Sequence, residues 1–378
     1  MYGAYHGNNS NGELSVTNIV IPGEDRITGV LYTPKETREG SPCVLLAHGI
    51  VKSKESLSGL ALELAKHGYI ALSVDLLGHG GSSGAIDESD LSLGVIRASD
   101  YLLTYSNNSH IGLIGHSMGA GAVYYAASHG VPENGVVLIG GGIGSNSYDT
   151  SKGFVVPQPW NPLVIIGRYD VLFTWERIEE SLGTTFPFHT PELNQLKGDP
   201  QGAYMTMLLM PYTSHLFEPV SPSVVESTVN WFNAINGVTV RKTQSYLLRE
   251  GLILFAFIFF MGALALASTI GAQPMSAPDF DWRRGVIYGL VGFIFFIPSM
   301  LLGNFLSFPP QIFGSSIAWW LLIWGMIVLV FSRYWKKSDF YRIEGEDVFY
   351  AFGLFFLSYL FVLGLEYLFG FGFRLIVP

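Results

Sequence analysis

Apolar and polar positions follow two alternating patterns along the first 240 residues. Short runs rich in aliphatic and β-branched residues predict buried strands, and apolar residues at i, i+3, i+4 spacing predict amphipathic helices. Strands are predicted at 17–21, 27–32, 43–47, 70–74, 111–115, 136–139, 163–166 and 205–209, and helices at 56–67, 91–105 and 118–129. This alternation is typical of an α/β domain whose sheet is covered by helices on both faces.

The pattern changes near Arg241-Lys242, where long and almost uninterrupted apolar runs begin. A helix needs about 20 apolar residues to cross a bilayer. Four runs approach that length, at about 251–272, 285–303, 316–331 and 348–371. The sequence therefore predicts an α/β domain over 1–240, followed over 241–378 by an all-α transmembrane domain of about four helices.

Basic residues between the apolar runs indicate an orientation in the membrane. One set of connections holds Arg283, Arg284, Arg333, Lys336, Lys337 and Arg342, and the other side holds Arg241, Lys242, Arg249 and Arg374. By the positive-inside rule the first set is cytoplasmic, which makes the chain a multi-pass membrane protein with its first 240 residues outside the cytoplasm.

Residues 1–20 contain no apolar stretch of signal-peptide length. Two interpretations follow: the first domain stays in the cytoplasm, or an export segment precedes the sequence printed here. We favour the second, in keeping with the charge distribution.

Composition narrows the classes of function. The chain has 30 acidic and 21 basic side chains and a net charge of −9 with no basic stripe, which argues against nucleic-acid binding. The nine histidines are scattered, there is no H-E-x-x-H motif, and Cys43 is the single cysteine. We therefore expect no metal site and no cofactor, and an intramolecular disulfide is excluded.

Gly115-His116-Ser117-Met118-Gly119 is the most informative motif. It lies between the predicted strand at 111–115 and a predicted helix that begins with small residues. A strand, a sharp turn with serine at its tip and then a helix is the context of a nucleophile elbow. Ser117 is the candidate nucleophile; the alternative is a small residue in a tight turn without chemistry.

The same G-x-S-x-G spelling also occurs at Gly80-Gly81-Ser82-Ser83-Gly84. There no small-residue helix follows directly, and the glycines indicate a loop after the strand at 70–74. The context therefore favours Ser117 over Ser82.

Three motifs occur in order: a strand ending at His48-Gly49, then Asp75-Leu76-Leu77-Gly78-His79-Gly80, then the Ser117 motif. Together they resemble the α/β-hydrolase superfamily over nearly all of 13–235, and most of all its esterase, lipase and dienelactone-hydrolase-like branch. The later apolar runs resemble membrane-tethered α/β hydrolases of bacteria and archaea. The resemblance implies a mostly parallel sheet flanked by helices, with an oxyanion hole formed by the backbone N–H groups of Ile50 and Met118.

In this superfamily the chain order is nucleophile, acid and histidine, the last two following late strands. Asp170 follows the predicted strand at 163–166, and His215 follows the one at 205–209. His215 would take the proton of Ser117, and Asp170 would orient the imidazole. The competing acids are Glu176, Glu179 and Glu180, which look like a solvated helix face, and the competing histidine is His189 in a polar insertion.

These features predict a membrane-anchored serine hydrolase that cleaves carboxylic esters through an acyl-enzyme. Its expected partners are a small-molecule or lipid ester and the membrane lipids. Two alternatives remain at this point: a serine peptidase of the same fold, and a non-catalytic binding module carried on a membrane domain.

Overall fold

The computed structural model describes residues 12–37, 40–50, 52–84, 90–141, 162–174, 206–210, 212–238 and 246–247, together with isolated helical positions between 251 and 326. The chain divides into two compact units, with the main boundary between Ile253 and Leu254. Each unit is described by itself.

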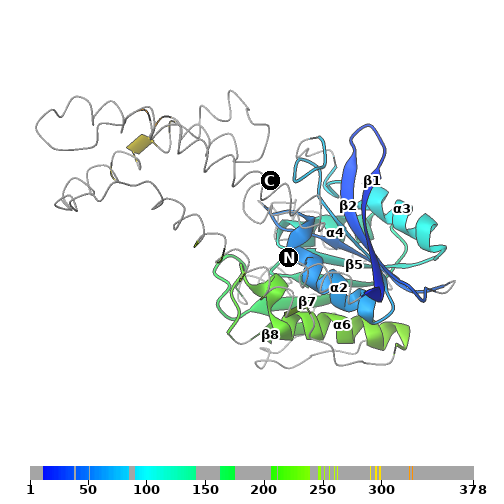
Figure 1. Ribbon diagram of the computed structural model, residues 1–378. Coiled ribbons are helices and arrows are strands. Elements are labelled where there is room, and N and C mark those ends of the chain that lie inside the picture. The colour runs from blue at the N-terminus through cyan, green and yellow to red at the C-terminus, as the bar shows by residue number, and fades with distance from the viewer. Residues whose placement is uncertain are drawn as a thin grey trace, which may run out of the picture. The chain divides into compact units, whose positions relative to one another are not determined.

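The first unit is built on an eight-stranded sheet (Figure 1). Its strands are β1 (Leu14–Ile21), β2 (Ile27–Pro34), β3 (Cys43–Ala47), β4 (Ile70–Val74), β5 (Ile111–His116), β6 (Glu133–Ile139), β7 (Pro162–Gly167) and β8 (Thr206–Met210). They lie in the order β1-β2-β4-β3-β5-β6-β7-β8. All neighbours from β4 to β8 are parallel, whereas β2 is antiparallel to both β1 and β4.

Helices cover both faces of this sheet (Figure 1). On one face lie α2 (Ser58–Lys66), preceded by the 3-10 turn η2 (Lys54–Leu57), and α6 (Pro222–Asn236), preceded by η5 (Glu218–Val220). On the other lie α3 (Val95–Ser106) and α4 (Met118–Ser128). The predicted α/β class and mostly parallel sheet are confirmed.

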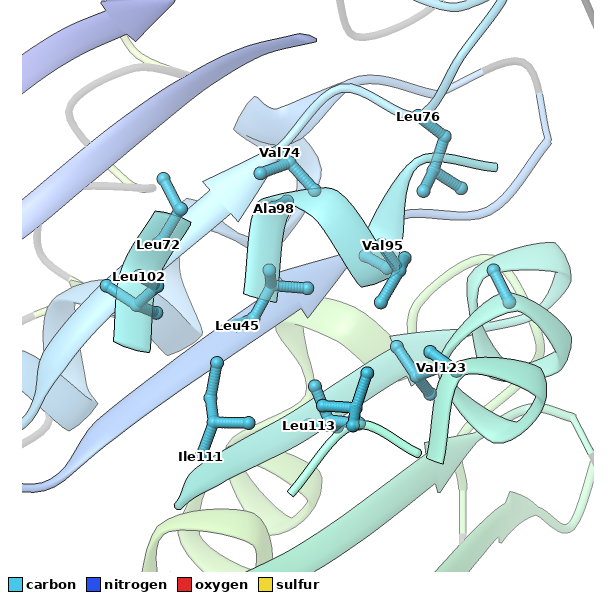
Figure 2. Packing of buried hydrophobic residues seen from close by; sticks show 14 of the residues in the cluster. Leu45, Leu72, Val74, Leu76, Val95, Ala98, Leu102, Ile111, Leu113 and Val123 are labelled. Carbon is cyan, nitrogen blue, oxygen red and sulfur yellow. The ribbon is translucent and has the colours of Figure 1, made fainter. Parts of the chain in front are cut away.

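The strands are hydrophobic on both faces because each face has its own core. Along β3, Leu45 belongs to the cluster beneath α3 and α4, and its neighbours Val44 and Leu46 belong to the cluster beneath α2 and α6. Figure 2 shows Leu45 near Ala98 and Leu102 of α3. A strand that is buried on both faces has a continuous run of apolar residues, and the sequence of β3 is such a run.

The helix predicted at 91–105 begins four residues later, at Val95. The Asp90 carboxylate accepts hydrogen bonds from the backbone N–H groups of Ser92 (3.0 Å) and Gly94 (3.1 Å), which closes a turn instead of a helix. Gly94 has φ +89°, a left-handed conformation that glycine adopts without steric cost.

Tyr246 belongs to the first unit, although it follows the change of pattern at residue 241. It is 1% exposed, packs in the core beneath α2 and α6, and its backbone N–H donates to the Glu63 carboxylate at 3.0 Å.

In the second unit the described positions are isolated and helical, and several present large apolar side chains to the surface. Phe255 is 67% exposed and Phe259 is 70% exposed. Within the described residues, none of the helices combines the length and apolarity needed to span a bilayer. The spans predicted at 251–272, 285–303, 316–331 and 348–371 lie outside the described residues apart from these positions, so they stay predictions.

Candidate active site

Ser117 lies at the turn between β5 and α4 in a strained backbone conformation. Its φ of 55° and ψ of −118° fall where few non-glycine residues are found. The turn is held because the Ser117 N–H donates to the Ile139 carbonyl (2.9 Å) and the Ala120 N–H donates to the Ser117 carbonyl (2.9 Å). The strand, turn and helix predicted from the sequence are therefore present.

The two glycines of the motif allow the backbone to pass close to this turn. A Cβ on Gly115 would overlap the carbonyl of Gly119, and a Cβ on Gly119 would overlap the carbonyl of Ala47 at the end of β3. Any side chain at either position would push α4 away from the sheet and displace Ser117.

Ser117, His215 and Asp170 form a continuous hydrogen-bonded chain. Nε2 of His215 lies 2.9 Å from Oγ of Ser117, and Nδ1 of His215 lies 2.8 Å from Oδ2 of Asp170. Because a carboxylate can only accept, Nδ1 carries the ring proton when the imidazole is neutral, which leaves Nε2 free to accept the serine proton. The structure thus brings together the three residues proposed from the sequence.

Asp170 is fixed by the turn that follows β7. Its N–H donates to the Gly167 carbonyl (3.0 Å), while its Oδ1 accepts from the N–H groups of Leu172 (2.8 Å) and Phe173 (2.9 Å). These bonds hold the carboxylate in one orientation and leave Oδ2 for His215. Asp170 is only 3% exposed, so these partners replace the water that would otherwise solvate its carboxylate.

The loop after β3 passes directly over the nucleophile. A Cβ on Gly49 would lie 3.0 Å from the Ser117 Cβ, so only glycine fits there without a shift. His48 holds this loop with two hydrogen bonds. Its Nδ1–H donates to the Gly49 carbonyl (2.8 Å), and its Nε2 accepts from the Leu76 N–H (3.1 Å). Burial lowers the pKa of His48 to about 4, so the ring is neutral and can accept this bond.

The predicted oxyanion residues flank Ser117 in this arrangement. Ile50 directly follows Gly49 and lines the cavity above the serine, and Met118 is the first residue of α4. The side chain of Met118 packs against the core beneath α3 and α4. Their donation to an oxyanion stays a prediction.

Two further residues beside the triad were not singled out as acid or base candidates. Glu218 is fully buried, and its Oε1 accepts from the Gly167 N–H at 2.7 Å. Its Oε2 lies 3.5 Å from Nε2 of His116 and 3.7 Å from Nδ1 of His215. Burial, together with the nearby Asp170, raises the pKa of Glu218 to about 8, although the hydrogen bond from Gly167 acts in the opposite direction. The only signal in the sequence was a glutamate three residues after the histidine.

His116, the last residue of β5, holds the loop that carries His215. Its Nε2–H donates to the backbone carbonyl of His215 at 3.0 Å, and burial holds its pKa well below the usual range. Ligand atoms of His116, His215 and Glu218 lie within 4.8 Å of one another. Both ring nitrogens of His215 are already engaged by Asp170 and Ser117.

The rivals considered from the sequence lie elsewhere or outside the described residues. Oγ of Ser82 donates to the Asp75 carbonyl (2.7 Å) and accepts from the Thr28 N–H (2.9 Å), so the second G-x-S-x-G is a structural loop. The residues Glu176, Glu179, Glu180 and His189 lie outside the described residues.

A cavity of about 440 Å³ opens onto Ser117 and His215. Its other lining residues are mostly apolar: Ile50, Tyr169, Val171, Leu172 and Leu216. Val171 is 78% exposed and Leu216 is 63% exposed, so the rim is open to solvent among the described residues. A cavity with apolar walls and a small number of polar groups at its floor suits a small organic ligand.

Part of the chain is similar to known proteins. Residues 42–180 match the family model for the alpha/beta hydrolase fold. An acyl transferase of Photobacterium leiognathi is 30% identical over 127 residues, which cover 32% of this chain and 40% of that relative's length.

One similar solved structure is that of a predicted CIB-like hydrolase from Thermoplasma acidophilum, which is 17% identical in sequence with a TM-score of 0.45. The match covers 58% of this chain and 99% of the Thermoplasma acidophilum chain. An esterase from Pyrococcus furiosus has 16% identity, 60% of this chain and 95% of the other covered, and a TM-score of 0.45.

The first unit is therefore an α/β hydrolase by fold. The resemblance to this superfamily inferred from the sequence is confirmed, while its membrane-tethered part stays a prediction.

Proposed function

We propose that this chain is a serine hydrolase that cleaves carboxylic esters through an acyl-enzyme. The hydrogen-bonded chain from Ser117 through His215 to Asp170, at the tip of a strained strand-to-helix turn, is the observation that carries the proposal. Serine is a poor nucleophile at its ordinary pKa and needs a base within hydrogen-bond reach, which His215 supplies.

In the proposed reaction, Oγ of Ser117 attacks the ester carbonyl carbon while Nε2 of His215 takes the hydroxyl proton. The negative charge on the carbonyl oxygen is held by the N–H groups of Ile50 and Met118, and Asp170 stabilises the imidazolium. His215 then gives its proton to the leaving alcohol as the carbon–oxygen bond breaks. Water, deprotonated by the same histidine, attacks the acyl-enzyme and releases the acid and free Ser117.

We further propose that the apolar runs after residue 250 anchor the enzyme in a membrane, with the hydrolase unit outside the cytoplasm. Lipid is the solvent in which exposed apolar helical surfaces such as Phe255 and Phe259 are stable. The open apolar rim of the cavity supports a small-molecule or lipid ester as the substrate.

A second candidate is acyl transfer, in which an alcohol or amine replaces water as the acceptor. The similarity to the acyl transferase of Photobacterium leiognathi supports it, and the two reactions share the same acyl-enzyme. The cavity rim is open enough for an acceptor to approach Ser117 after the first leaving group departs.

The test is turnover of phenyl esters and of peptide anilides by the detergent-solubilised full chain, with and without an added acceptor alcohol. Phenyl esters should be hydrolysed, and peptide anilides should not. Adding an acceptor alcohol should leave free acid as the main product. Ester formation in place of free acid would favour the transferase, cleavage of the anilides would favour the peptidase, and no turnover of any substrate would favour the binding module.

A further inference from the structure

Lys52 is a charged residue inside the cavity that the proposed reaction does not use. It lines the same cavity as Ser117 and His215 and lies two residues after Ile50. Its backbone N–H donates to the Gly49 carbonyl at 3.2 Å, which closes the turn that carries Ile50. The same turn therefore places both a proposed oxyanion donor and the lysine.

The ammonium group of Lys52 has no ion pair with the described residues, in contrast to the neighbouring Lys54. Lys54 lies 2.7 Å from the Asp75 carboxylate and 3.2 Å from that of Glu55, and these partners raise its pKa although burial opposes them. For Lys52, burial lowers the pKa to about 8, with Glu218 opposing only in part. Two lysines two positions apart thus have opposite environments: within the part of the chain that the structure describes, Lys54 is in an ion pair and Lys52 is not.

The acidic groups near Lys52 are committed elsewhere. Asp170 accepts from His215 and from two backbone N–H groups, and Glu218 accepts from Gly167 with a pKa raised to about 8 by burial. The remaining titratable neighbours, His116 and His215, are not anions. Among the described residues around the cavity, none therefore neutralises the lysine at neutral pH.

The walls around the lysine strengthen its attraction for an anion. Ile50, Leu172 and Leu216 line the cavity together with Lys52 and offer no polar side-chain group, while Ser214 and Tyr169 add only uncharged hydroxyl groups to the lining. A charge interaction in such surroundings is several times stronger than in bulk water. Burial deprives the Lys52 ammonium of stabilisation by water, and an anion bound in the cavity would replace that stabilisation.

We propose that Lys52 forms an anion-binding subsite of the ester pocket, and that the preferred substrates are esters carrying a carboxylate or phosphate group besides the scissile ester bond. This inference rests on the proposed esterase function, because it names the substrate class of the same site. Lys52 is a specificity-determining residue that contacts the substrate away from the bond that breaks.

The test compares esters that differ only in charge. Phenyl hydrogen adipate and phenyl hexanoate have acyl chains of equal length, one ending in a carboxylate and the other in a methyl group. Meta-carboxyphenyl and meta-carbamoylphenyl hexanoate place the same difference on the leaving alcohol. The quantity measured is the ratio of kcat/KM for the anionic ester to that for the neutral ester, and the pair that shows the preference tells which side of the ester faces Lys52.

In the wild type we expect the anionic member of one pair to be preferred. Lys52→Met should lower this ratio roughly 10- to 100-fold, the effect of removing one charge-assisted hydrogen bond, and Lys52→Arg should keep most of it. The ratio should also fall as the pH rises above about 8, since the lysine then loses its charge. Lys35→Met, which removes an exposed positive charge after β2, is the matched control and should not change the ratio.

A ratio in Lys52→Met within twofold of the wild type overturns the inference while leaving the esterase proposal intact, provided that phenyl hexanoate is cleaved. An equal loss of kcat/KM for both members of each pair also overturns the inference. Lys52 would then stabilise the oxyanion or the fold and would not bind the anionic group of the substrate. Absence of cleavage of all four esters by the wild type contradicts the proposed function and the inference with it.

Discussion

Oε2 of Glu218 lies 3.7 Å from Nδ1 of His215, the same ring nitrogen that donates to Asp170 at 2.8 Å. Two buried carboxyl groups thus face one histidine nitrogen. Burial, with a smaller contribution from the negative charge of Asp170, raises the pKa of Glu218 to about 8. Near neutral pH most Glu218 is protonated, so His215 faces a single carboxylate.

Replacing Glu218 by Gln should change how stability depends on pH. The folded-state pKa of Glu218 is raised, so the folded chain holds this proton where the unfolded chain releases it. Its stabilisation is present below the unfolded pKa of about 4.5 and is lost as the pH rises toward about 8. Thermal unfolding of Glu218→Gln between pH 5 and 8.5 should therefore show a Tm several degrees less sensitive to pH than the wild type.

Glu226→Gln on the exposed side of α6 is the control and should follow the wild-type curve. Parallel Tm curves for Glu218→Gln and the wild type would show that Glu218 has an ordinary pKa in the folded chain.

Asp170→Asn should lower kcat for phenyl esters by about 10⁴. An amide at this position can donate its hydrogen to Nδ1, which favours the imidazole tautomer with the proton on Nε2, and that nitrogen can then no longer accept the serine proton. Initial rates with phenyl hexanoate measure the effect. The exposed Asp100→Asn on α3 should keep wild-type rates, and a loss of less than tenfold in Asp170→Asn would require another acid.

Gly119→Ala should destabilise the fold by about 2 kcal/mol or more, because the new Cβ would overlap the Ala47 carbonyl. Urea unfolding followed by circular dichroism measures this change. A Cβ on Gly251 would meet nothing within 4 Å, so Gly251→Ala is the matched control and should leave stability nearly unchanged. Equal stability of the two variants would contradict the close packing of α4 on β3.

Asp75→Asn should cost about 3–5 kcal/mol, since it leaves the buried ammonium of Lys54 without its main partner. Burial by itself favours the protonated form of Asp75, but Lys54, His48 and the hydrogen bond from Gly81 together outweigh it and lower the pKa of this carboxyl. The stabilisation is therefore present above the unfolded pKa of about 3.8 and is lost as the pH falls through the lower folded value. Urea unfolding at pH 7 and pH 3 tests both points; a variant as stable as the wild type at pH 7 would contradict them.

The sequence predicted the parts of the site that depend on local order. Ser117 was recognisable because a strand, a glycine-flanked turn and a small-residue helix follow one another within 20 residues of sequence. Asp170 and His215 were found because each follows a late strand, and the carboxyl ends of parallel strands meet at one edge of the sheet.

Features set by contacts between distant segments were not predictable in this way. Glu218 is buried where it meets the Gly167 N–H, 51 residues away in sequence, and this burial raises its pKa. The difference between Lys52 and Lys54 depends on which lysine reaches Asp75, 21 residues from Lys54. The late start of α3 depends on the Asp90 turn, whose side-chain bonds compete with helix formation.

Fluorophosphonate labelling of the solubilised wild type beside Ser117→Ala tests the central claim most directly. A fluorophosphonate reacts with a serine only when a base has activated it. We predict a single adduct on Ser117 in the wild type and none in Ser117→Ala. Equal labelling of both proteins, or labelling of neither, would contradict the account of Ser117, His215 and Asp170 as the catalytic triad.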